Sequence, residues 1–107
     1  MTREQERIKL FNLNSSNRQI RNKMMKTLKF TKNGDYDRAA RILKETRKEF
    51  DQIRNEHNDL FEETNYKKNV HETESSFGFT EVLHDFVSQA NRLQAHNCSA
   101  VKFHIYN

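Results

Sequence analysis

Residues 28–43 read LKFTKNGDYDRAARIL and contain the clearest structural boundary in the chain. The 107 residues include no proline and only two glycines, so there are few places where a helix must stop. Asn33 and Gly34 are typical of a helix C-terminus that ends in the left-handed backbone conformation, and Asp35 is typical of the N-cap of the next helix. The stretch therefore predicts a tight turn between two antiparallel helices.

Before this turn, the pattern predicts one amphipathic helix over residues 2–32. Residues 2–5 read TREQ, a capping-box pattern that places the start of the helix near the N-terminal end. Its stripe combines apolar residues at helical spacing with two polar seam positions: Leu10, Leu13, Asn17, Ile20, Met24, Thr27 and Leu28.

After the turn, the pattern predicts a second helix over residues 36–63. Its seam alternates steps of three and four residues, the period typical of helices packed in a bundle. The seam consists of Tyr36, Ala39, Leu43, Thr46, Phe50, Ile53, His57 and Leu60.

The third part of the chain has a less regular pattern. Residues 64–78 read TNYKKNVHETESSFG, which lacks a helical apolar period and is rich in polar residues, so we expect a long loop over residues 64–79. A third helix is predicted over residues 80–105. Its expected core stripe is Leu83, Phe86, Ala90, Leu93, Asn97, Val101 and Ile105.

Three such helices predict one all-α domain over residues 1–107, an antiparallel three-helix bundle. Only 34% of the residues are hydrophobic, so a lone bundle of this size would be marginally stable. Val82, Val87 and Cys98 add apolar surface beside the stripe of the third helix. We therefore expect self-association through that helix.

The composition bears on the cellular location of the protein and on the kinds of site it can contain. No apolar run approaches the roughly 20 residues of a membrane helix, and the segment MTREQERIKL lacks the apolar core of a signal peptide. The single cysteine cannot form an internal disulfide, and no histidines or carboxylates have the spacing of a closed metal site. We therefore expect a cytoplasmic protein without membrane insertion, metal or cofactor.

Charge is unevenly distributed along the chain. Residues 1–34 carry nine Lys/Arg against two Glu, whereas residues 35–63 carry six basic against nine acidic residues. A basic first helix could face an acidic second one or an anionic partner. The chain could therefore also be a basic helical module that binds nucleic acid, although no tryptophan or helix-turn-helix accompanies the basic residues. The residues that could contact phosphates are Arg18, Arg21, Lys23, Lys26, Lys29 and Lys32.

The sequence over residues 10–43, LFNLNSSNRQIRNKMMKTLKFTKNGDYDRAARIL, resembles the start of the lactose/cellobiose-specific enzyme IIA components of the bacterial sugar phosphotransferase system. Those proteins open with a helix, turn through a similar glycine-aspartate-aromatic element followed by alanines, and close with a third helix after a variable loop. The matching residues here are Asn33, Gly34, Asp35, Tyr36, Ala39 and Ala40. The similarity runs without gaps over residues 10–63 and continues into the third helix in one of two registers.

The resemblance implies a homotrimer with the third helices near its axis. It also implies a phosphoryl relay from the phosphocarrier HPr to a IIB domain, through a histidine in a third-helix pattern like V-H-x-x-D-H-L-M. Such a relay needs a neutral imidazole nitrogen as nucleophile and cations or hydrogen-bond donors around the phosphoryl oxygens. Matching His84 to the family histidine puts Val87 at the aspartate position and Ser88 at the second histidine.

A second register keeps the flanking valine and leucine of the pattern at Val87 and Leu93. It places the family's nucleophile, aspartate and second histidine at Ser88, Asn91 and Arg92. That register removes the transfer chemistry.

The resemblance leads to two functions, of which the first is our hypothesis from the sequence and the second its alternative. In the first, the chain is a phosphoryl carrier that accepts phosphate on His84, helped by His57 if it faces His84 across the second and third helices. In the second, the chain is a catalytically inactive IIA-like regulatory or scaffolding protein. The candidate partner or phosphate contacts are His57, Ser88, Asn91 and Arg92, and the last three could form a polar patch at the subunit interface.

Overall fold

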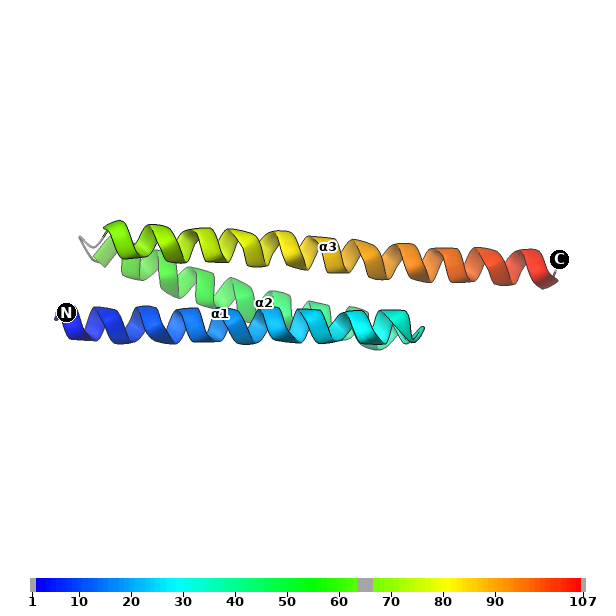
Figure 1. Ribbon diagram of the computed structural model, residues 1–107, viewed down its shortest axis with the longest axis horizontal. Helices are drawn as coiled ribbons and strands as arrows, with labels where there is room; N and C mark the ends of the chain where they lie inside the picture. The colour runs from blue at the N-terminus through cyan, green and yellow to red at the C-terminus, as the bar shows by residue number, and fades with distance from the viewer. Residues whose placement is uncertain (1, 64–66, 107) are drawn as a thin grey trace.

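The computed structural model consists of three long helices, α1 (Arg3–Lys32), α2 (Tyr36–Glu63) and α3 (Lys67–Tyr106). It describes the backbone at residues 2–63 and 67–106, and the side chains at residues 2–60, 62 and 75–97. Each helix packs against the other two, and the chain runs up, down and up along a rod of 67 × 16 × 16 Å (Figure 1). The described residues contain no strand, so the all-α antiparallel three-helix bundle is confirmed.

The α1–α2 turn has the predicted geometry. Gly34 has φ of +82°, the left-handed conformation that glycine adopts without steric cost. Its N–H donates to the carbonyl of Thr31 (3.1 Å), and the N–H of Asp35 donates to the carbonyl of Phe30 (2.9 Å). These two bonds satisfy carbonyls that the end of α1 would otherwise leave open. At the other end of α1, Thr2 forms the predicted capping box.

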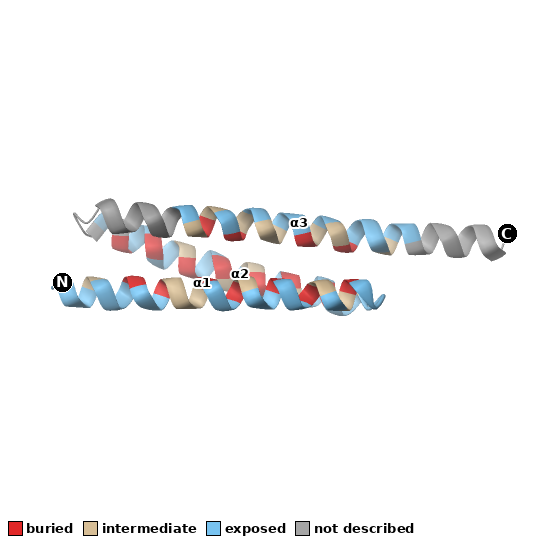
Figure 2. Ribbon diagram, viewed as in Figure 1, coloured by how far each residue is buried: buried red, intermediate tan, exposed pale blue. Residues whose placement is uncertain are grey.

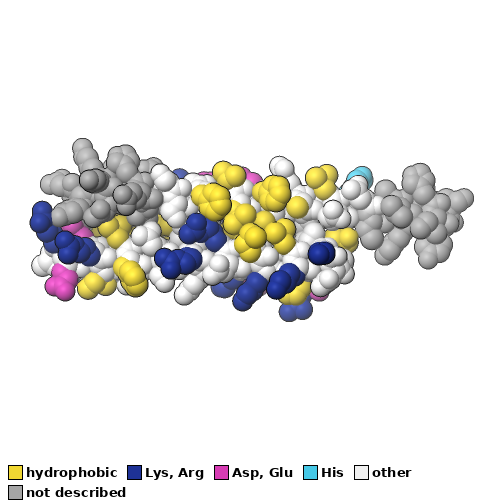
Figure 3. All heavy atoms as spheres, in the orientation of Figure 1, with side chains coloured by type: hydrophobic (Ala, Val, Ile, Leu, Met, Phe, Trp, Pro, Cys, Tyr) yellow, Lys and Arg dark blue, Asp and Glu magenta, His cyan; other side chains and the backbone are white. Residues whose placement is uncertain are grey.

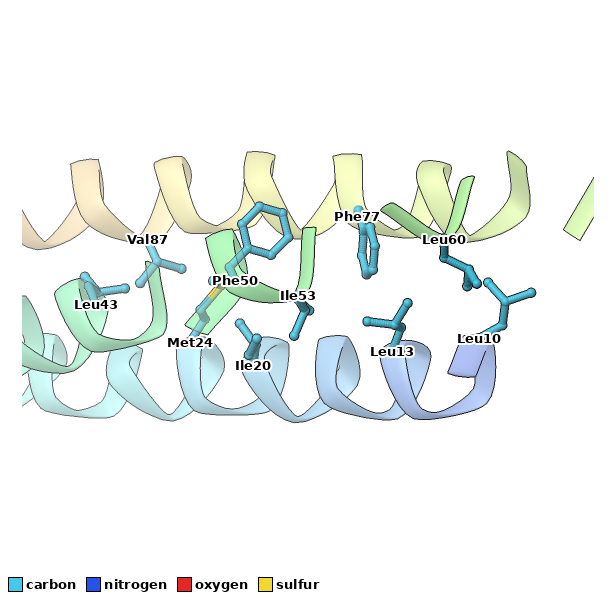
Figure 4. Packing of buried hydrophobic residues seen from close by; sticks show 10 residues of the cluster. All are labelled: Leu10, Leu13, Ile20, Met24, Leu43, Phe50, Ile53, Leu60, Phe77 and Val87. Carbon is cyan, nitrogen blue, oxygen red and sulfur yellow. The ribbon is translucent and has the colours of Figure 1, made fainter. Parts of the chain in front are cut away.

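The core is one row of apolar side chains from all three helices. Figure 2 shows the buried residues on the faces that the helices turn toward one another, and Figure 4 shows the apolar members of this row. The row consists of Leu10, Leu13, Ile20, Met24, Leu43, Phe50, Ile53, Leu60, Phe77 and Val87. The stripes predicted for α1 and α2 are therefore the buried faces.

The predicted loop over residues 64–79 is wrong where the structure describes it, because α3 already begins at Lys67. Phe77 lies in the core at 1% exposure, with its ring edge-to-face against Phe50 (6.1 Å between ring centroids) and His57 (4.7 Å). Burial of such a ring offsets the weak helix propensity of the polar residues around it. Residues 64–66 lie outside the described residues.

The core stripe predicted for the third helix is right at Leu83, which packs against the core, but wrong at other positions. Phe86 and Leu93 are 64% and 62% exposed, whereas Thr80, Val87 and Asn91 are buried. The polar residues can occupy the core because their hydrogen bonds are satisfied there: Thr80, for example, donates from Oγ1 to the carbonyl of Ser76 (3.1 Å). The predicted members at 101 and 105 lie outside the described side chains.

No helix, over the residues that the structure describes, combines the length and apolarity needed to cross a membrane.

Candidate functional site

A cleft of about 450 Å³ separates part of α2 from α3. This α2–α3 cleft is lined by Ala40, Leu43, Lys44, Arg47 and Lys48 from α2 and by His84, Asp85, Ser88, Asn91 and Arg92 from α3. Four of the five residues singled out in the sequence therefore lie around one cleft. The α2 residues bring three further cations that sequence reasoning missed.

The imidazole of His84 lies against α2. Its Nε2 is 3.0 Å from the carbonyl oxygen of Leu43, an acceptor, so Nε2 carries the proton and donates. In the neutral ring the lone pair is therefore on Nδ1. That atom is buried, no group among the described residues hydrogen-bonds to it, and the carboxylate of Asp85 lies 3.9 Å away.

This arrangement does not present a nucleophile to solvent. The His84 side chain is only 12% exposed, and its one unprotonated nitrogen is the buried one. A phosphoryl group must approach the attacking nitrogen along an open line, with reacting atoms about 3–3.5 Å apart. In this conformation the ring of His84 is a hydrogen-bonded packing element between α2 and α3.

Asn91 joins the three helices at the base of the cleft. Its Oδ1 accepts a hydrogen bond from Thr31 Oγ1 (2.7 Å) near the end of α1, and its Nδ2 donates to the carbonyl of Tyr36 (3.2 Å) at the start of α2. One end of the side chain must accept and the other must donate. A carboxylate cannot do both, so an ionised aspartate does not fit this position.

The structure does not bring His57 to the cleft. His57 is buried in the core with its ring edge-to-face against Phe77, and Phe77 lies two helical turns before His84 on α3. Because His84 instead contacts Leu43, the two histidines do not form the pair considered from the sequence.

The cations of the cleft differ in their partners. Arg47 is paired with Asp51 (3.2 Å) and with Glu81 (3.4 Å), whose other oxygen pairs with Arg54 (3.1 Å). Lys44, Lys48 and Arg92, by contrast, form no ion pair within the described part of the chain. The spacing of the α2 cations at 44, 47 and 48 puts three basic residues on one flank of the apolar seam, but it does not indicate which helix that flank faces.

A second surface feature is an apolar strip on the outer side of α3. We call it the α3 strip and define it by Phe79, Val82, Phe86 and Leu93, all exposed. Figure 3 shows hydrophobic side chains gathered in the middle of this face, with Lys and Arg around them. Arg21 of α1 lies over the ring of Phe79, 5.7 Å from its centroid, and the exposed Met25 lies on the same helix as Arg21.

The described residues contain no cluster of three or more histidine, cysteine or acidic side chains able to hold a metal ion. Comparisons of the chain with protein-family models, with curated proteins and with solved structures found no match. The assignment of function therefore depends on the site itself and on the resemblance described above.

Proposed function

We propose that the chain is an enzyme IIA-like regulatory module of the sugar phosphotransferase system that does not transfer a phosphoryl group. The observation that carries this proposal is the geometry of His84, whose Nε2 is hydrogen-bonded to Leu43 and whose Nδ1 is buried. The second register, which matches Ser88, Asn91 and Arg92 to the site residues of the family, supports the proposal as well. Ser88 and Arg92 are poor phosphoryl acceptors, and the side chain of Asn91 is already hydrogen-bonded at both ends to the other helices.

The direct test is a phosphorylation assay. The purified chain is incubated with phosphoenolpyruvate, enzyme I and HPr, and its intact mass is measured at neutral pH. We expect the mass to stay unchanged, with an active enzyme IIA as the positive control. An acid-labile phosphate that disappears in His84→Ala would overturn the proposal.

That opposite outcome would support the second candidate, a phosphoryl carrier for lactose- or cellobiose-class sugars. One observation favours it: His84 lies in the same cleft as Lys44, Lys48 and Arg92, whose charges would stabilise the oxygens of a transferred phosphoryl group. The carrier would require the ring to leave the Leu43 carbonyl and expose Nδ1 or Nε2 to HPr.

The proposal includes a homotrimer assembled through the α3 strip, because contiguous exposed apolar surface on one helix is typical of protein interfaces. It also includes HPr or a IIB domain as docking partners and a cytoplasmic location. We do not propose nucleic-acid binding. Lys23 on α1 is paired with Glu49 on α2 (3.0 Å), and Arg21 lies on Phe79, so two of the basic residues already have partners within the bundle.

A further inference from the structure

The α2–α3 cleft concentrates positive charge that the described residues do not neutralise. Lys44 and Lys48 lie one helical turn apart on α2, and like charges at this spacing destabilise a helix. Arg92 faces the same cleft from α3. None of the three forms an ion pair with a described residue, so an anion in the cleft would relieve their mutual repulsion.

The other charged groups of the cleft form a separate network. Arg47 is held by Asp51 and Glu81 and is therefore fixed in position and already neutralised. The carboxylate that lines the cleft, Asp85, is 70% exposed and lies 3.9 Å from His84 Nδ1. Apart from the paired Arg47, the cleft is therefore lined by three cations and one carboxylate, so its net charge is positive.

From this arrangement we infer that the α2–α3 cleft binds a small phosphate monoester, of the size of a sugar phosphate, without reacting with it. A phosphate dianion matches two lysine point charges and the planar guanidinium of Arg92, which donates in pairs to phosphate oxygens. The hydroxyl of Ser88 adds a donor at the same wall. The volume of about 450 Å³ leaves room for a molecule of this size.

This inference goes beyond the proposed function, because it concerns reversible binding by Lys44, Lys48 and Arg92 and does not depend on the enzyme IIA-like assignment. The residues that line the site also favour a whole small molecule over an inorganic ion. Leu43 and Ala40 give the cleft an apolar wall, against which the carbon skeleton of a sugar phosphate can lie.

The test is a titration of ¹⁵N-labelled protein with glucose 6-phosphate, followed by two-dimensional NMR at constant ionic strength. Glucose and inorganic phosphate are titrated separately. We expect saturable shifts at amides of residues 44–48 and 84–92 with glucose 6-phosphate, weaker binding of inorganic phosphate, and no shifts with glucose. Absence of saturable shifts with glucose 6-phosphate, or equal shifts with glucose, would overturn the inference.

Matched variants locate the binding. Lys44→Gln/Lys48→Gln is expected to weaken glucose 6-phosphate binding about tenfold or more, since two charge-assisted contacts are lost. Lys26→Gln/Lys29→Gln removes the same charge from exposed positions on α1 and is expected to change the affinity less than about twofold. Equal losses in both variants would show attraction to overall charge and would overturn the site. All four lysines are exposed, so the variants should fold, which circular dichroism verifies.

Discussion

At the scale of single residues, Asn91 explains why an amide and not an acid occupies this point of the bundle. The side chain is buried, accepts from Thr31 and donates to the Tyr36 carbonyl, so both ends have the partner that their chemistry requires. His84 is fixed in the same way by one hydrogen bond to a backbone carbonyl. Residues that look catalytic in the sequence therefore serve first to fix α3 against its neighbours.

Asn91→Asp is expected to lower the free energy of unfolding by about 2 kcal/mol, because the carboxylate loses the donor to Tyr36 and faces its carbonyl oxygen instead. Urea denaturation at one fixed protein concentration and neutral pH measures the change. Gln89→Glu is the matched control, since it makes the same chemical change at an exposed position of α3 and should stay within about 0.5 kcal/mol. Equal effects of the two substitutions would show that the Asn91 hydrogen bonds contribute nothing specific.

The sequence could indicate these site residues but not their environment. The resemblance singled out His84, Ser88, Asn91 and Arg92, and the structure places all four around one cleft. The contribution of Lys44 and Lys48 depends on which flank of α2 faces α3. The rotation of α2 about its own axis decides this, and it is set by long-range packing, which local sequence patterns do not encode.

At the scale of secondary-structure elements, local chemistry decides the α1–α2 turn, whereas tertiary packing decides where α3 begins. Asn33 and Gly34 end α1 through backbone geometry alone, so the sequence was sufficient there. No glycine lies between α2 and α3 to mark where the third helix begins. This helix continues through Gly78 because Phe77 is buried among side chains from the other helices, and apolar burial outweighs propensity.

The two glycines should therefore respond oppositely to alanine. Gly34→Ala is expected to lower the free energy of unfolding by about 1–2 kcal/mol, because an L-residue is strained at φ of +82°. Gly78→Ala is expected to raise it by about 0.5–1 kcal/mol, because the position is helical and a methyl group there meets no atom within 4 Å. Urea denaturation of both variants measures the two changes. Destabilisation by Gly78→Ala would mean that α3 is not helical at this point.

At the scale of the whole molecule, α3 has two apolar faces and can satisfy only one within its own bundle. The inner face includes Phe77 and Val87, and the outer face is the α3 strip. The sequence predicted self-association from surplus apolar residues on this helix, and that stays a prediction, but it assigned Phe86 and Leu93 to the core, where they do not lie. The error arose because two apolar stripes on one helix have the same period, and only packing against α1 and α2 distinguishes them.

Assembly of the chain is expected to depend on the α3 strip. Phe86→Asp places a charge in the centre of the strip and is expected to convert the proposed trimer into monomers, because an unpaired carboxylate cannot be buried in an apolar interface without a large desolvation cost. Phe11→Asp makes the same substitution at an exposed phenylalanine of α1 outside the strip, and that variant should remain trimeric. Light scattering coupled to size-exclusion chromatography gives the mass of each species over a range of concentrations. A wild-type chain that is monomeric throughout, or a Phe86→Asp variant that stays trimeric, would show that the strip does not hold copies of this chain together.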